Sequence, residues 1–131
     1  MKIKTSKTLL LLTIIVLSIV SVYSQENNGP IISFEENKFS FDTIARNSNG
    51  EHNFFFVNTG SEPLLITSAF SSCGCVVPEF PKQPILPGEK SSIKVKYNTN
   101  IVGDFTKVIV VRSNDKEKPK SILRISGFVA K

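Results

Sequence analysis

The alternation of apolar and polar residues between residues 91 and 112 restricts the fold more than any other feature. After Ser91, every second residue is large and apolar through Tyr97, with serine or lysine between. A period of two places successive side chains on opposite faces of a strand, whereas a helix requires a period near 3.6. The alternation returns after Gly103, where one face carries Phe105, Lys107, Ile109 and Val111. The pattern predicts two neighbouring β-strands.

Further short apolar segments are separated by polar turns, and no segment of helix length lies between them, which disfavours an α/β fold. They are residues 31–34, 39–41, 52–57, 64–67 and 123–129. Many short strands with frequent turn signals are typical of an all-β, immunoglobulin-like sandwich of about seven strands, with a closed barrel as the alternative. The side chains expected in its core are Phe54, Phe56, Leu65, Ile93, Val95, Tyr97, Ile109, Val111, Leu123 and Ile125. Phe55 should point outward, because its neighbours point inward.

The N-terminus has the organisation of a secretory signal peptide. Three lysines precede an apolar run, and Val22 and Ser24 have the spacing that signal peptidase recognises. The run is shorter than the roughly 20 residues that span a bilayer, which disfavours a retained membrane anchor. A lipid anchor would need a cysteine just after the run, and the first is Cys73. We expect a signal peptide at residues 1–24, a mobile leader at 25–30 and the sandwich at 31–131. The mature protein is then periplasmic or extracellular, soluble, not a lipoprotein and without a membrane span.

The positive charge belongs largely to the predicted signal peptide. The chain has 16 basic and 11 acidic residues, and removing the three leading lysines leaves a net charge of +2. Nucleic-acid binding therefore loses its main support. Lys116, Lys118 and Lys120 alternate with acidic residues and proline, which indicates a solvated loop.

Three turns carry specific signals. Asn49-Gly50 is the strongest hairpin signal in the chain, because this pair adopts the backbone angles of two-residue hairpin loops. Pro87-Gly88 predicts a type II turn with a positive φ at the glycine. Residues 58–60 form a third turn, which we interpret as structural.

Residues 70–89 contain both cysteines and four of the seven prolines. Cys73 and Cys75 would be ~6.6 Å apart in a regular strand, whereas a disulfide needs Cβ atoms about 3.5–4.5 Å apart. We expect Gly74 to let the backbone turn and close this gap. Export to an oxidising compartment then favours a local disulfide. Free or partner-reactive thiols and a metal site remain as alternatives, although a metal would need further ligands, from His52 or a second molecule.

The chain resembles a bacterial family known as domain of unknown function 1573. The similar segments are residues 39–44, 56–60, 63–66, 72–75, 87–89, 93–97 and 123–127. The resemblance implies an exported immunoglobulin-like sandwich related to the major sperm protein, PapD and ASH domains, but no chemistry. Asp42 stands where the family usually has glycine, and both residues tolerate left-handed backbone geometry. Val76 and Phe80 replace the usual threonine and tryptophan.

No catalytic constellation is visible in the sequence, so we predict a non-enzymatic module without cofactor or metal. His52, the single histidine, has no nucleophile or orienting carboxylate close in sequence, and we expect it to face solvent. The candidate functional loop is Cys73, Gly74 and Cys75. The first hypothesis is a module that binds a protein or envelope component through a sheet edge or this loop. The second is a redox or metal-handling protein that uses the two cysteines.

Overall fold

The computed structural model describes residues 7–15 and 28–131. Residues 7–15 are helical, and the described ranges contain no helix with the length and hydrophobicity needed to cross a membrane. The predicted cleavage site after Ser24 and residues 25–27, half of the predicted leader, lie outside the described residues. Residues 28–131 contain eight strands and the connections between them: β1 (Ile32–Phe34), β2 (Lys38–Ala45), β3 (Glu51–Asn58), β4 (Ile66–Ser71), β5 (Val76–Glu79), β6 (Lys90–Tyr97), β7 (Gly103–Ser113) and β8 (Lys120–Ala130).

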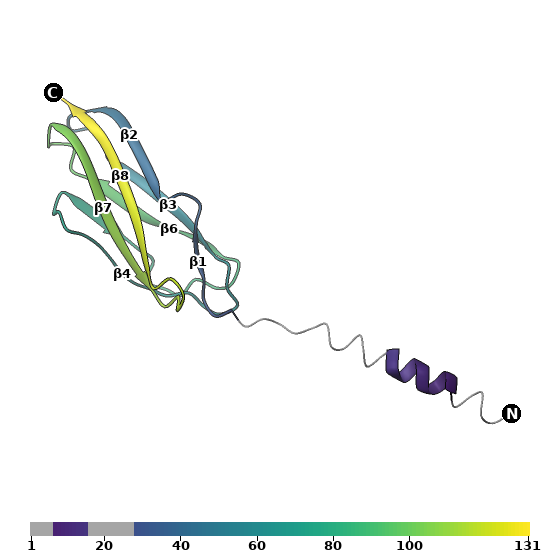
Figure 1. The fold of residues 1–131 in the computed structure, drawn as a ribbon. Helices are drawn as coiled ribbons and strands as arrows, with labels where there is room; N and C mark the ends of the chain where they lie inside the picture. The colour runs from purple at the N-terminus through teal and green to yellow at the C-terminus, as the bar shows by residue number, and fades with distance from the viewer. Residues whose placement is uncertain (1–6, 16–27) are drawn as a thin grey trace.

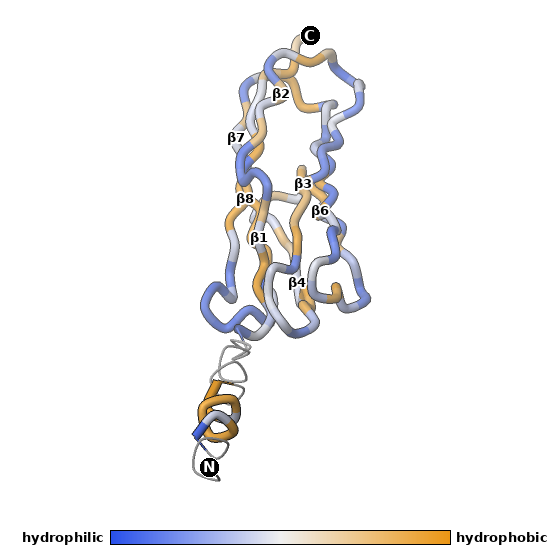
Figure 2. Tube along the Cα trace, turned by 90° about the vertical axis from the view of Figure 1, so that its right-hand side faces the viewer, coloured by the Kyte–Doolittle hydropathy of each residue, from blue (hydrophilic) through white to orange (hydrophobic). Residues whose placement is uncertain are grey.

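The strands form two four-stranded sheets that face each other. The first sheet has the order β1-β3-β6-β5 and the second has the order β2-β8-β7-β4. Figure 2 shows β2, β7 and β8 on one side of the sandwich, with β3 and β6 on the other. The chain enters the sandwich at the end opposite its C-terminus (Figure 1). The predicted all-β immunoglobulin-like sandwich is confirmed, with eight strands where about seven were expected.

The first two strands belong to different sheets. β1 pairs antiparallel with β3, and the chain then crosses so that β2 pairs parallel with β8. Asp42 has a φ of 54° where the register of β2 shifts, between Ser40 and Thr43. Asp42 therefore adopts the left-handed backbone geometry that it was expected to tolerate. The shift separates the two regular halves of the parallel pairing.

The core lies between the sheets and follows the predicted alternation closely. Phe54, Phe56 and Ile109 are fully buried, and Phe55 points outward with 42% of its surface exposed. Leu65 was expected in the core but is exposed, and this prediction is wrong. Its neighbours Leu64 and Ile66 are buried instead, because Leu64 forms a bridge with Ile85 that sets the inward side of this segment.

Two of the turn predictions have different outcomes. Gly88 has a φ of 82°, and the Glu89 N–H donates to the Leu86 carbonyl, as a type II turn requires. The Asn49-Gly50 hairpin prediction is wrong, because β2 and β3 are in different sheets and do not pair. The segment between them is an arch across the sandwich, in which Asn47 has the positive φ, 63°.

Candidate functional site

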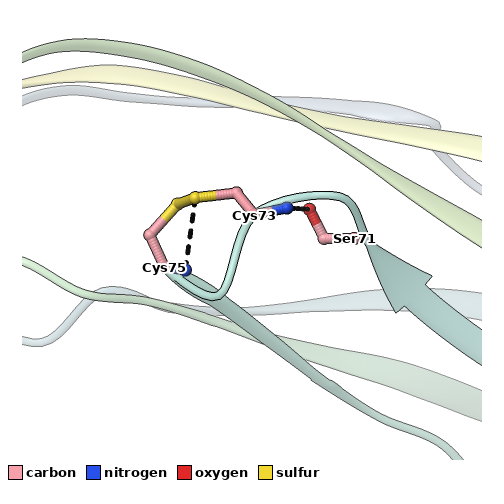
Figure 3. Close-up of a disulfide and its surroundings, with 3 residues drawn as sticks. All are labelled: Ser71, Cys73 and Cys75. Carbon is pink, nitrogen blue, oxygen red and sulfur yellow. Dashed lines mark hydrogen bonds between the residues drawn. A yellow bond between two sulfur atoms is a disulfide. The ribbon is translucent and has the colours of Figure 1, made fainter.

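The cysteine loop connects the edge strands of the two sheets on one side of the sandwich. β4 is the last strand of the second sheet, β5 is the last strand of the first, and residues 72–75 join them. The sulfur atoms of Cys73 and Cys75 lie 1.97 Å apart, at disulfide distance, and their Cα atoms are 5.2 Å apart. Figure 3 shows the bond between the two sulfur atoms and the turn of the backbone from Cys73 to Cys75.

Hydrogen bonds hold the loop at both ends. The Cys73 N–H donates to the Ser71 hydroxyl at 3.5 Å, and the Cys75 N–H donates to the Cys73 sulfur at 3.2 Å (Figure 3). The Asn98 N–H donates to the Cys75 carbonyl at 2.8 Å, which attaches the loop to the end of β6. Cys75 is buried and Cys73 half-buried, so the ring lies against the core with Ser72 and Gly74 exposed.

The conformation of Gly74 differs from our expectation. Its φ is outside the positive range, and a Cβ added there would meet no atom within 4 Å. The expectation that the loop needs glycine to turn is therefore wrong for the backbone described here. The Val76 N–H donates to the Cys73 carbonyl at 3.3 Å, so an ordinary tight turn closes the gap.

The edge of β4 lies directly before the loop. β4 pairs with β7 on one side and has no strand on its other side among the described residues. Its six residues, Ile66–Ser71, contain no proline. The neighbouring edge strand β5 has four residues, one of which is Pro78, a residue without an N–H donor. β4 is thus the edge on this side that can hydrogen-bond to a further strand.

His52 lies within the sandwich rather than facing solvent, so that expectation is wrong. Its ring stacks on Phe39, with centroids 3.6 Å apart, and its Nε2 lies 2.6 Å from a Glu36 carboxylate oxygen. The side chain is only 17% exposed. Glu36 belongs to the crossover from β1 to β2, which brings it to β3 although 16 residues separate it from His52. Sequence proximity could not reveal this carboxylate.

The structure keeps His52 apart from the cysteines. In the first sheet, β6 lies between β3, which carries His52, and β5, which follows Cys75. The form of the metal alternative in which His52 supplies a ligand required these residues to meet, and this arrangement excludes it. Among the described residues, no group of three or more histidine, cysteine, aspartate or glutamate side chains is placed to hold a metal ion.

The best-satisfied buried polar side chain is Asn58, which the sequence identified only as part of a turn. Its oxygen accepts hydrogen bonds from the N–H groups of Ile31 and Gly60, at 3.3 and 3.0 Å. Its nitrogen donates to the carbonyls of Glu62 and Ile85, at 2.8 and 2.9 Å. Asn58 is fully buried and so joins three segments of the chain. This network is structural and confirms that interpretation of the turn.

A second buried polar residue, Asp115, lies at the same end of the molecule. Its carboxylate accepts from the N–H of Ile32 at 3.1 Å, and from those of Glu117 and Lys118 at 3.0 Å. Asp115 therefore attaches the turn that connects β7 and β8 to the strand β1. Its carboxylate oxygens are occupied by backbone donors, which explains a buried acid without invoking catalysis.

Comparison with known proteins supports the class that the fold defines, an immunoglobulin-like sandwich, and the solved structures with a similar fold include an ASH/PapD-like domain. A protein of unknown function from Porphyromonas gingivalis W83 aligns with a TM-score of 0.70 and 11% identity, covering 81% of this chain and 50% of its own. This chain therefore spans half the length of that protein. The ASH/PapD-like domain 7 of human CEP192 aligns with a TM-score of 0.61 and 9% identity, over 83% and 92% of the two chains.

The periplasmic chaperone SfaE is also similar, with a TM-score of 0.53 and 7% identity, over 76% of this chain and 56% of its own. At these identities the likeness concerns the fold alone. A comparison with curated protein sequences gave no match. Residues 32–129 match the family described as protein of unknown function (DUF1573), and the chain belongs to this family. The resemblance expected from the sequence is confirmed.

Proposed function

We propose that this protein is an exported, non-enzymatic module that binds an extended protein segment along the edge of β4, beside the cysteine loop. The observation that carries the proposal is the open edge of β4. An exposed edge strand presents unpaired N–H and C=O groups that a partner strand can complete. The loop with Cys73 and Cys75 would border the end of the added strand.

The other edges are less suited to strand addition. β1 has three residues, and β5 is short and contains Pro78. β2 has a register shift and a left-handed residue, Asp42, in its middle. Bulges and proline are devices that block edge pairing. β4 has a register shift only near its start, between Ile66 and Ser68, and pairs regularly with β7 from there to its end.

The fold comparison supports a binding role at a general level. SfaE is a periplasmic chaperone, and the CEP192 domain shares the same sandwich. The predicted signal peptide at residues 1–24 supports export. Neither observation identifies a partner, so the edge of β4 is the specific part of the proposal.

Site-specific photo-crosslinking in cells tests the proposal. A photoreactive residue at Ser68, on β4, should give crosslinked products with a protein of the cell envelope. The same residue at Ser92, on the central strand β6, is the matched control and should give none. With the captured protein purified, hydrogen exchange of the β4 amides should slow on binding. Unchanged exchange at β4, or equal crosslinking from Ser92, would contradict strand addition.

A redox role for Cys73 and Cys75 is the second candidate function, favoured by the disulfide distance between two sulfurs in one short loop, in which Cys73 is half-buried and Cys75 buried. In this role the reduced Cys73 thiolate would attack a disulfide of a partner, which releases one partner sulfur as a thiol and forms a mixed disulfide that Cys75 then resolves. Replacing Cys75 with serine would trap such a partner on Cys73. Capture that requires Cys73, with no dependence on the edge of β4, would favour this role over strand binding.

A further inference from the structure

A row of apolar side chains crosses the outer face of the second sheet. Phe70 of β4 is paired with Val110 of β7, and Val110 is paired with Ile122 of β8. Phe70 is 47% exposed and Ile122 is 42% exposed. Val108, two residues from Val110, lies on the same face. A contiguous apolar row on a sheet exterior differs from the isolated apolar residues found on most protein surfaces.

Cations border this row on both sides. On one side, Arg124 of β8 is paired with Lys38 of β2. On the other side, Arg112 of β7 is paired with Lys120 of β8. All four side chains are exposed. Each cationic row is two residues from the apolar row along the strands. The two cationic rows are therefore four residues apart, or about 13 Å at ~3.3 Å rise per residue.

Among the described residues these cations have no acidic partner, in contrast to Lys90 and Lys94 of the opposite face. In the first sheet, Lys94 pairs with Glu51 at 3.5 Å, and Lys90 pairs with Glu35 at 2.6 Å. Among the described residues no ion pair involves the cations that border the apolar row, and the three rows contain no acidic residue. The positive charge is therefore concentrated on one face.

We propose that this basic-apolar face, formed by Lys38, Phe70, Val110, Arg112, Lys120, Ile122 and Arg124, docks an acidic protein surface. The matching surface has an apolar centre flanked by carboxylates about 13 Å apart, the distance between residues four apart in an extended chain. The apolar centre would cover Phe70 and Ile122, and the carboxylates would pair with the arginines. Charge complementarity of this kind directs association and selects the partner. The proposal does not depend on strand addition at β4, which uses backbone groups of the edge.

Two other occupants fit the face less well. A second copy in a two-fold face-to-face arrangement would oppose like charges, which is unfavourable. An anionic bilayer would meet the long lysine and arginine side chains first, on both sides of the shorter apolar row. The apolar side chains would then stop at the headgroups and gain little from burial in hydrocarbon.

A random-peptide phage library, selected against the purified protein, provides the test. We expect enriched peptides with aspartate or glutamate on both sides of an apolar residue. Their affinity should fall about tenfold or more in the Arg112→Glu/Arg124→Glu variant and with rising salt. The matched charge reversal Lys82→Glu/Lys96→Glu lies outside the face and should leave affinity within about twofold. Circular dichroism checks that both variants are folded.

The remaining outcomes would overturn the proposal. Selection that yields no acidic peptides, or peptides that bind both variants equally, would show that the face does not select carboxylates. Binding to vesicles of equal phosphatidylglycerol and phosphatidylcholine that is lost in Arg112→Glu/Arg124→Glu would assign the face to lipid. Sedimentation that shows self-association broken by Ile122→Ser would assign it to a second copy.

Discussion

The ring of Tyr97 stacks on the ring of Phe105, with centroids 3.8 Å apart and planes within 12° of parallel. Tyr97 is the last residue of β6 and Phe105 lies near the start of β7, so the pair connects the two sheets. Both side chains are buried. The stack forms near the cysteine loop, because Val76, which follows the loop, is paired with Tyr97.

We predict that Tyr97 makes stability depend on pH in alkaline solution. Burial raises the pKa of the Tyr97 hydroxyl above its ordinary value. The unfolded chain loses this proton near pH 10, whereas the folded chain retains it. The stabilisation is therefore complete below about pH 10 and is lost as the pH rises through the folded pKa. Tyr97→Phe should remove this part of the pH dependence, which denaturant unfolding at a series of pH values measures.

The composition makes the titration of Tyr97 directly observable. The chain has two tyrosines and no tryptophan, and the other tyrosine, Tyr23, belongs to the predicted signal peptide. Tyrosinate absorbance of a protein without residues 1–24 then reports Tyr97 alone. A folded pKa equal to that of the unfolded protein would contradict this prediction.

Asn58→Ala should destabilise the protein strongly. The substitution leaves two carbonyls and two N–H groups without their side-chain partner, and of these the Ile85 carbonyl keeps the Leu64 N–H. The cost is about 1–3 kcal/mol for each group that stays unsatisfied. Urea unfolding should show a loss of at least ~3 kcal/mol. The matched control is Asn53→Ala on the exposed side of β3, for which we expect a change within about 0.5 kcal/mol. Similar losses in the two variants would show that the network contributes little.

Gly50→Ala and Gly74→Ala should have opposite outcomes. A Cβ on Gly50 would lie 2.5 Å from the Tyr97 carbonyl oxygen, whereas a Cβ on Gly74 would meet nothing within 4 Å. We expect Gly50→Ala to cost about 1–3 kcal/mol through overpacking against backbone. Gly74→Ala should keep both stability and the cysteine pairing. Thermal unfolding of the two variants measures the difference, and strong destabilisation by Gly74→Ala would restore the case for a special conformation there.

The cysteine pair should be oxidised in the exported protein and contribute little to stability. A ring closed over two residues of separation restricts the unfolded chain only slightly, so Cys73→Ser/Cys75→Ser should cost less than about 2 kcal/mol. Thiol titration of denatured, non-reduced protein gives the oxidation state. Finding two free thiols would reject the disulfide, while a much larger loss of stability would indicate that native contacts of the loop dominate.

Export with cleavage after Ser24 is decided by intact-mass measurement of protein recovered outside the cytoplasm. We expect the mass of residues 25–131 without modification other than the loss of two hydrogens on disulfide formation. Retention of residues 1–24, or an attached acyl group, would contradict the predicted signal peptide. A Val22→Arg variant, which removes a residue that signal peptidase recognises, should accumulate as the uncleaved precursor.

Strand alternation made most of the core predictable, because a period of two fixes which side chains share a face. Phe54, Phe56 and Ile109 were assigned correctly for this reason. Leu65 was assigned incorrectly, because it lies in a run of three apolar residues, 64–66. Such a run does not indicate which of its side chains point inward. The Asn49-Gly50 signal also failed, because a local turn signal does not indicate whether the following strand stays in the same sheet.

The candidate surfaces depend on pairing between distant segments, which the sequence does not display. Lys120 was interpreted as part of a solvated loop with Lys116 and Lys118, but it is the first residue of β8. Register then brings it beside Arg112, and brings Ile122 into line with Phe70 through Val110. The available signal was Ile122, an apolar residue at a position that the alternation of β8 places on the outer face. Its neighbours on the face could not be known without the strand order.

The parallel pairing of β2 with β8 also determines when the fold can be completed. Lys38 is paired with Arg124, so β2 has no sheet partner until the residues of β8 have been synthesised. Contacts between such distant segments form slowly, because a long loop must close before they contribute. A nascent chain that carries the predicted signal peptide would therefore stay incompletely folded during most of its synthesis. The pairing of β2 with β8, which completes the second sheet, thus also delays the formation of native structure. This delay would keep the chain in a state suited to the predicted export.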